Sequence, residues 1–357
     1  MTIEEPVRLS RGKRLMFGAC VVALAFGLPL VGLLAVDVHL HHKYERSAGY
    51  NIWGYRGPVV GGKHDGEIRI AAFGGSTTYG YGVNWDEAFP AVLERDLAKA
   101  SPRPVSVVNL AYNNEGAFAD LFTMKDYQYL HYDVALLYSG YNDLMGDDGP
   151  NFSVYRHDSP VFRVIGYMPI FPMVFREKAA IMLSGEPGGL YHRDAKTVFR
   201  PGLAAWTKGE ILNAAANVGE SLQRQLAGGG HRTQSIGDDA GGSGCKSPWT
   251  HYCSAVLASI EYALREKHQV LVVTPPYEIG SELRARHKEQ QAEMAGLVSR
   301  RFGSSPQVMY VNLGDAVDLT DPALSFDRMH LTAEGNRRIA DALVGPMLQL
   351  IARRGGP

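Results

Sequence analysis

The chain has 357 residues, of which 45% are hydrophobic and 20% are charged, so it can bury one large core or two smaller ones. Its formal net charge is −1, whereas a nucleic-acid-binding protein would need a clustered basic face, so we predict no nucleic-acid partner. The three cysteines form neither a zinc-ligand pattern nor a Cys-x-x-Cys motif.

The first distinct element is the run Leu15–Val36, which has 22 residues and no charge. At a rise of about 1.5 Å per residue, it is long enough to cross a hydrocarbon core about 30 Å thick. Pro29 lies within it, and a membrane helix tolerates a proline that would break a soluble one. Basic residues precede the run, which by the positive-inside rule keeps the N-terminus in the cytoplasm: Arg8, Arg11, Lys13 and Arg14. We predict a cytoplasmic tail over 1–14, a transmembrane anchor over 15–36 and a juxtamembrane segment over 37–60.

Two other interpretations of this run are weaker. A cleaved signal peptide has an apolar stretch of about 7–15 residues and a small-x-small cleavage site. Here the run is longer, and its end, Ala35-Val36-Asp37-Val38-His39, has no clean site. Cys20 is too close to Arg14 to be a lipoprotein cysteine. An uncleaved anchor would place the rest of the chain outside the cytoplasmic membrane, in the periplasm.

Beyond the anchor, residues 61–352 alternate between strand-like and helix-like runs. Short runs rich in β-branched residues predict five buried parallel strands: Ile68–Phe73, Val105–Leu110, Asp133–Tyr138, Gln269–Thr274 and Val308–Asn312. Amphipathic stretches predict the helices: Glu87–Ala100, Ala117–Leu130, Ser254–Lys267, Glu282–Phe302 and Thr332–Ile351. This alternation predicts a three-layer α/β/α fold with a doubly wound, mostly parallel five-stranded sheet, preceded by one transmembrane helix.

One stretch, at about 146–252, does not fit the alternation, and we predict that it is an insertion. Its part Val161–Phe175 is strongly apolar, and could be a lid, a surface that leans on the membrane or grips an acyl chain, or ordinary packing onto the core. The part Gly228–Gly244 is rich in Gly, Ser and Asp and predicts a loop. In an oxidising compartment Cys245 and Cys253 could close a small disulfide loop, and the alternative is two free thiols.

Two short motifs carry the chemistry. Gly74-Gly75-Ser76-Thr77-Thr78 follows the first predicted strand, and Asp327-Arg328-Met329-His330-Leu331 lies near the C-terminus. A serine hydroxyl is a poor nucleophile until a base takes its proton, and a histidine is a reliable base only when a third group fixes its tautomer. Asp327, three residues before His330, is well placed to be that group. We therefore predict that Ser76 is a nucleophile and His330 its base.

Two further pieces follow the next predicted strands. Ser76 follows the first strand, Gly116 the second and Asn142 the third. Ligands of doubly wound sheets bind beyond the C-terminal ends of the strands, so these residues should converge on one rim. There the backbone N–H groups of Ser76 and Gly116 and the side-chain amide of Asn142 could stabilise an oxyanion. Taken singly, each residue could instead be an ordinary turn former.

In this order, the four pieces resemble the SGNH (GDSL-like) hydrolase family, named for its Ser, Gly, Asn and His. The resemblance covers about residues 50–350. Gly75 stands where many members have Asp, and the second block is stretched, because Gly116 lies seven residues after Asn109. The stretch Tyr50–Gly57 resembles the lead-in of many bacterial relatives, and we expect it to pack against the domain. The resemblance implies a Ser76–His330–Asp327 triad with an oxyanion hole of Ser76, Gly116 and Asn142.

Together the anchor and the resemblance predict a membrane-anchored periplasmic serine esterase that cleaves an acyl ester, such as acetyl, of an envelope glycan or lipid. An O-acyltransferase with the same triad, a lipase or thioesterase, and a non-catalytic glycan-binding domain stay open. We predict no cofactor, because no Gly-x-Gly-x-x-Gly motif follows a strand and there is no P-loop. We also predict no metal site, although two clusters could suggest one: His39, His41 and His42, and Asp143, Asp147 and Asp148.

Overall fold

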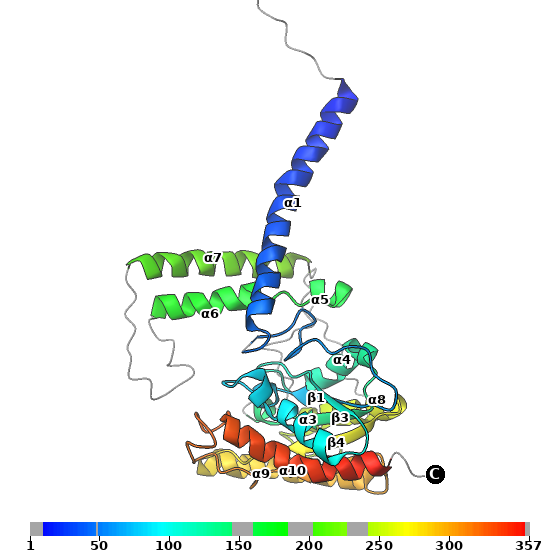
Figure 1. The fold of residues 1–357 in the computed structure, drawn as a ribbon. Coiled ribbons are helices and arrows are strands. Elements are labelled where there is room, and N and C mark those ends of the chain that lie inside the picture. The colour runs from blue at the N-terminus through cyan, green and yellow to red at the C-terminus, as the bar shows by residue number, and fades with distance from the viewer. Residues whose placement is uncertain (1–9, 48, 145–159, 185–202, 227–241, 354–357) are drawn as a thin grey trace, which may run out of the picture.

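The computed structural model describes residues 10–47, 49–144, 160–184, 203–226 and 242–353 (Figure 1). Its strands are β1 (Ile68–Gly74), β2 (Val105–Asn109), β3 (Val134–Tyr138), β4 (Gln269–Thr274) and β5 (Val308–Asn312). The helices around them are α2 (Ser76–Tyr79), α3 (Phe89–Ala100), α4 (Phe118–Asp126), α8 (Thr250–Arg265), α9 (Ser281–Phe302) and α10 (Ala333–Ala352). Helix α1 (Arg11–Tyr44) precedes the sheet, and α5 (Pro160–Ile165), α6 (Phe171–Ser184) and α7 (Leu203–Leu226) lie in the predicted insertion. Short 3-10 turns are η1 (Trp85–Glu87), η2 (Gln128–Leu130) and η3 (Tyr141–Asp143).

The strands form one sheet in the order β2-β1-β3-β4-β5, and every neighbouring pair is parallel. In the centre, Ile70 of β1 is in register with Val107 of β2 and Val134 of β3. Because all five strands run the same way, their C-terminal ends meet at one edge. The predicted α/β fold is confirmed.

Side chains alternate between the two faces of the sheet, as the period of two in a strand requires. Along β1, Ile68, Ile70 and Ala72 pack in the layer of α3 and α10, whereas Ala71 and Phe73 pack in the layer of α4, α8 and α9. Both faces are covered, so each strand reads as a nearly continuous apolar run. This is the reason that the strands could be predicted to within one residue at their ends.

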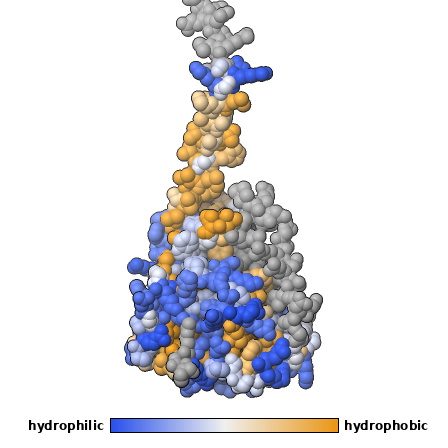
Figure 2. All heavy atoms as spheres, turned by 90° about the vertical axis from the view of Figure 1, so that its right-hand side faces the viewer, coloured by the Kyte–Doolittle hydropathy of each residue, from blue (hydrophilic) through white to orange (hydrophobic). Residues whose placement is uncertain are grey.

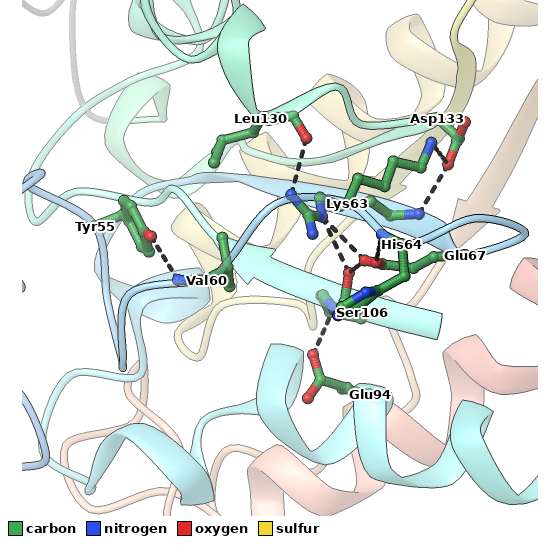
Figure 3. A network of polar contacts seen from close by, with 11 residues as sticks. Tyr55, Val60, Lys63, His64, Glu67, Glu94, Ser106, Leu130 and Asp133 are labelled. Atoms are coloured by element: carbon green, nitrogen blue, oxygen red, sulfur yellow. Dashed lines mark hydrogen bonds and ion pairs between the residues drawn. The ribbon is translucent and has the colours of Figure 1, made fainter. Parts of the chain in front are cut away.

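A network of buried charges holds the opposite edge of the sheet, where the strands begin (Figure 3). Arg69 of β1 donates to Glu67 Oε1 at 3.0 Å and to Leu130 O at 3.1 Å. Asp133 accepts the backbone N–H of Arg69 at 2.8 Å and pairs with Lys63 at 2.5 Å. A buried charge is tolerated only with such partners, so each member depends on the others. The network fixes the first residues of the strands and lies away from the edge where the motifs meet.

Helix α1 differs from the predicted anchor at its C-terminal end. Its most apolar window is fully exposed, and it is the one helix within the described ranges that is long and apolar enough to span a membrane. The helix continues past Val36 to Tyr44, through residues predicted to form a separate juxtamembrane segment. The sequence did not predict this continuation because Asp37 and His41 are polar, and their partners Ile170 and Met168 are distant in sequence. Residues 1–9 of the predicted cytoplasmic tail lie outside the described residues.

The junction between α1 and the domain is built on Asp37 and His41. Asp37 Oδ1 accepts the backbone N–H groups of Ile170 and Phe171, at 2.9 and 2.6 Å. The two ring nitrogens of His41 lie 2.7 Å from Tyr50 O and 2.9 Å from Met168 O. His41, one of the histidines considered as a metal ligand, is therefore held by backbone carbonyls.

The predicted insertion contains a helical hairpin. Helices α6 and α7 pack against each other at two glycines, since a Cβ at Gly209 would lie 2.8 Å from Leu183 and one at Gly219 would lie 2.8 Å from Phe171. In the apolar part Val161–Phe175, four side chains pack in the core, as the simplest interpretation expected: Phe162, Met168, Ile170 and Val174. Residues 146–159, 185–202 and 227–241 of the predicted insertion, which include most of the predicted loop Gly228–Gly244, lie outside the described residues.

Two smaller expectations meet different outcomes. Cys245 and Cys253 form a disulfide with a Cα–Cα distance of 6.3 Å, the first of the two alternatives that the sequence left open. The single helix predicted over Ala117–Leu130 is divided into α4 and η2, because Tyr127 leaves the helical conformation. The lead-in Tyr50–Gly57 packs against the domain as expected, with Tyr50 and Tyr55 almost fully buried.

Candidate active site

Ser76 begins α2 directly after β1, at the edge where the strands end. Gly74 has a φ of +148°, and a Cβ there would lie 2.2 Å from the carbonyl oxygen of Tyr138 in β3. Only glycine allows this approach, so it lets β1 turn sharply beside its neighbour. Thr78 Oγ1 donates to the same carbonyl at 3.2 Å. The turn thus presents Ser76 at a fixed position on the rim.

Helix α2 is held in place by contacts between aromatic rings and by hydrogen bonds from an amide side chain. The ring of Tyr50 lies 4.8 Å from the rings of both Tyr79 and Tyr112. Asn109, at the end of β2, donates through Nδ2 to the carbonyls of Thr78 and Tyr79, at 2.9 and 3.3 Å. These bonds satisfy carbonyls at the end of a four-residue helix that has little stability of its own.

The three residues of the predicted triad are brought together. His330 Nε2 lies 2.8 Å from Ser76 Oγ, and His330 Nδ1 lies 2.6 Å from Asp327 Oδ2. With the proton on Nδ1 donated to Asp327, Nε2 is free to accept the proton of Ser76. Residues that are 254 positions apart in sequence therefore form one hydrogen-bonded chain.

A tight turn before α10 holds the acid and the base. Asp327 Oδ1 accepts the backbone N–H groups of Met329 and His330, at 3.0 and 2.6 Å. Arg328, between Asp327 and Met329, has a φ of +72°, a left-handed conformation that is strained for a residue with a Cβ. Burial raises the pKa of Asp327, but its hydrogen bonds with the His330 ring and backbone outweigh burial and hold that pKa below its usual value. Asp327 is therefore a carboxylate at neutral pH.

Two aromatic side chains that the sequence analysis did not assign flank the imidazole. The ring of Tyr81 lies 4.7 Å from that of His330, and the ring of Phe326 lies 6.2 Å away and nearly parallel. Gly82, with a φ of +88°, leaves room for Phe326, since a Cβ there would lie 2.1 Å from its ring. The available signal was proximity in sequence, because one ring lies five residues after Ser76 and the other directly precedes Asp327.

A second carboxyl group, besides that of Asp327, lies near the triad and was also missed. Glu278 follows β4, is almost fully buried, and interacts electrostatically with Asp327 and His330. Burial raises the pKa of Glu278, a hydrogen bond from Ile279 N–H opposes the rise, and the charge of Asp327 adds to it. No motif marks Glu278, so only the fold shows that it lies here.

Two of the three predicted oxyanion donors, Ser76 and Asn142, line a small cavity. Asn142, in η3 after β3, donates through Nδ2 to Glu115 O at 2.8 Å. The cavity is lined by Gly75, Ser76, Glu115 and Asn142 among others. Its volume, taken as the space that the centre of a water molecule can occupy, is about 10 Å³. Ser76 and Asn142 thus share one cavity. Glu115 lines it, while the neighbouring Gly116 lies against Asp143 Oδ1, which would be 2.7 Å from a Cβ at that glycine.

Asp143 connects the segment that carries Gly116 with the segment that carries Asn142. Its carboxyl oxygens accept the backbone N–H of Ala117, at the start of α4, at 3.2 and 3.1 Å. Burial raises the pKa of Asp143 to about 7, although this hydrogen bond lowers it. The neighbouring Asp147 and Asp148 lie outside the described residues. Within the described ranges, no group of three or more His, Cys, Asp or Glu side chains could hold a metal ion.

The comparisons with known proteins include the following distant structural neighbours. No family model matches the sequence, and no curated protein matches it. A solved structure of a candidate lipolytic protein of the G-D-S-L family from Desulfitobacterium hafniense DCB-2 is 14% identical, with 78% of this chain and 98% of that chain covered and a TM-score of 0.41. An acetylxylan esterase from Geobacillus stearothermophilus is 11% identical, with 80% and 94% covered and a TM-score of 0.41.

A carbohydrate esterase family 2 enzyme from Corynascus thermopiles is 12% identical, with 83% of this chain and 69% of that chain covered and a TM-score of 0.38. The first of these neighbours is named as a member of the G-D-S-L family, which the motifs of this chain resemble. At these identities and TM-scores the likeness assigns no activity to this chain, and a function has to be argued from the residues at the rim.

Proposed function

We propose that the protein is a serine esterase with Ser76 as its nucleophile. The observation that carries this proposal is the continuous chain of hydrogen bonds from Ser76 Oγ through the His330 ring to Asp327. Ser76 Oγ attacks the acyl carbonyl while His330 Nε2 takes its proton, and the same proton is then given to the leaving alcohol. Water then attacks the acyl-enzyme with His330 again as the base, which releases the acid and restores Ser76.

The oxyanion of each tetrahedral intermediate needs preset donors. Ser76 N–H, Gly116 N–H and Asn142 Nδ2 are the groups that we propose for it. The shared cavity supports the roles of Ser76 and Asn142. Losing one such donor typically costs about 2.7–4 kcal/mol of transition-state stabilisation.

The size of that cavity supports a short acyl group. The cavity has room for about one water-sized group, which the oxyanion itself would take, so it leaves no space for a long acyl chain. We therefore propose acetyl, or another short acyl group, as the group transferred to Ser76. A lipase or thioesterase that binds a long chain inside this cavity would need more room.

Location follows from α1, and we propose that this helix is an uncleaved anchor with the catalytic domain outside the cytoplasm. Its exposed apolar window, its preceding basic residues and its unbroken continuation into the domain support this. An envelope glycan or lipid ester would then be within reach. A C-terminal alkaline phosphatase fusion should be active and a green fluorescent protein fusion exported by the general pathway should be dark, and the reverse pattern contradicts the topology.

The activity is tested on the full chain in detergent with p-nitrophenyl esters from acetyl to long-chain and with a fluorophosphonate probe. We expect the fastest hydrolysis for the acetyl ester and one probe adduct, on Ser76. Ser76→Ala should lose both, while the matched control Ser299→Ala, at an exposed position on α9, should keep both. Labelling that persists in folded Ser76→Ala contradicts the proposal. Transfer of the acetyl group to a sugar hydroxyl instead of water would identify an O-acyltransferase.

A further inference from the structure

The catalytic domain begins where the apolar run of α1 ends. Val36 is the last residue of that run, and the next residue, Asp37, is only 2% exposed. One turn farther on, Leu40 and His41 are also buried in the domain. There is thus no spacer between the proposed membrane span and the domain, so the domain surface around α1 must lie close to the bilayer.

Helix α7 presents an apolar stripe on this side of the molecule. In Figure 1 its ribbon crosses that of α1 at the level of the lower half of α1, and α6, on which α7 packs, contacts α1. Gly209 and Gly219 face α6, whereas Leu203, Ile211 and Val218 are 82%, 63% and 59% exposed. These three residues lie eight and seven positions apart, or about two helical turns each, so they form one stripe along the helix.

Helix α5 adds a second exposed apolar group. Val164 and Ile165 are 81% and 63% exposed. Ile165 also lines a cleft of about 480 Å³ that is rich in aromatic side chains, including Trp53 and Tyr129. Such rings, apolar with one polar atom, favour membrane–water interfaces. Figure 2 shows hydrophobic residues gathered where α1 meets the domain and mostly hydrophilic residues farther from it.

We propose that these five residues, Val164, Ile165, Leu203, Ile211 and Val218, are a membrane-facing surface that lies in the interface of the bilayer crossed by α1. Helix α7 then lies in the plane of the interface, with its stripe about 5–10 Å into the boundary between headgroups and acyl chains. The occupant is lipid and not another protein, because α1 leaves the proposed span at Asp37, which bonds Ile170 and Phe171 at the start of α6, and α7 packs on α6. Helices α1, α5 and α7 then hold the domain at one height and in one orientation over the membrane.

The test uses the full chain in proteoliposomes with an environment-sensitive fluorophore on single cysteines. Native Cys20, within the proposed span, is the only free thiol among the described residues, and its labelled form is the positive control. In a Cys20→Ser background, Ile211→Cys and Val218→Cys report on α7, and Ser299→Cys, on α9 at the far end of the domain in Figure 1, is the matched control. The fluorescence of each labelled variant is measured in lipids that carry a quenching nitroxide on the acyl chain, either near the headgroup or near the end of the chain.

We expect loss of fluorescence at 211 and 218, strongest with the nitroxide near the headgroup, and none at 299. Failure of quenching at Cys20 would contradict the membrane span itself, which separates that failure from failure of this inference. If Cys20 is quenched while 211 and 218 behave like 299, the stripe faces water and the proposal is wrong. If 211 and 218 are shielded from water but not quenched by lipid, protein covers the stripe, and the proposal is equally wrong.

Discussion

Replacement of Gly75 by alanine tests the geometry of the proposed oxyanion hole. A Cβ at this position would lie 2.3 Å from Asn142 Nδ2 and 3.0 Å from Glu115 O. Gly75 has a φ of −90° and a ψ of −153°, values that residues with a Cβ adopt without strain. The substitution therefore acts through the clash alone.

The size of the effect follows from the displacement. The 2.3 Å approach is about 1.1 Å short of the 3.4 Å at which ordinary contact begins, so the Asn142 amide must move by roughly that distance. A misplacement of about 1 Å typically costs about 10²-fold in rate, and complete loss of an oxyanion donor costs about 10²–10³-fold in kcat. We expect Gly75→Ala to lower kcat within that range with much less change in KM.

The assay is a double-mutant cycle on a p-nitrophenyl acetate substrate with Gly75→Ala, Asn142→Ala and both together. Because both changes remove the same donor, the double variant should be no slower than Asn142→Ala alone. Gly61→Ala is the matched control, since a Cβ there meets nothing within 4 Å. The reasoning is refuted if folded Gly75→Ala keeps the kcat of the parent, or if the two losses multiply.

Three further predictions concern the triad and the pH dependence of stability. Ser76→Ala and His330→Ala should each reduce ester hydrolysis to near background, since nucleophile and base act as a unit. Asp327→Ala should keep more activity. A wild-type rate of hydrolysis in Ser76→Ala would exclude the triad. The pKa of Asp143, about 7 against an ordinary 3.8, means that the folded state binds more protons between these values. Stability from this group therefore falls as pH rises through that window, and Asp143→Asn should flatten the fall in a plot of Tm against pH. Burial lowers the pKa of His41, but the bond with Asp37 and two backbone carbonyls outweigh burial and raise that pKa above 6.5. Its stabilisation is complete below pH 6.5 and lost as pH rises through the raised pKa, so His41→Gln should remove a decline of Tm at higher pH; an unchanged decline would contradict the assignment.

The sequence predicted the sheet well because the physical cause of each strand is local. A parallel strand covered on both faces is a short run of apolar residues, and such runs are visible without the fold. Helix ends were predicted less well, because tertiary contacts decide them. Helix α1 continues to Tyr44 since Asp37 and His41 find partners more than a hundred residues away, at Ile170 and Met168.

The same distinction applies to the candidate site. Ser76, His330 and Asp327 could be predicted because a turn after a strand and a close Asp–His pair are local patterns. The position of Glu278 could not, because its burial and its nearness to Asp327 arise only when the segment after β4 packs beside the turn before α10. The environment of Gly116 could not be predicted either, since it depends on Asp143, which approaches it from η3, after β3.

One series of contacts connects the proposed anchor to the nucleophile. His41 of α1 lies 2.7 Å from the carbonyl oxygen of Tyr50, whose ring packs 4.8 Å from that of Tyr79 in the four-residue helix that Ser76 begins. The hydroxyl of Tyr50 accepts the N–H of Asn113, which lies between β2 and the Glu115 carbonyl that holds Asn142. A helix as short as α2 cannot hold its own geometry, so it takes it from what it packs on. The segment between α1 and β1 is therefore part of the support of the candidate site. If α1 is the proposed anchor, the residues that position Ser76 also set its height over the membrane.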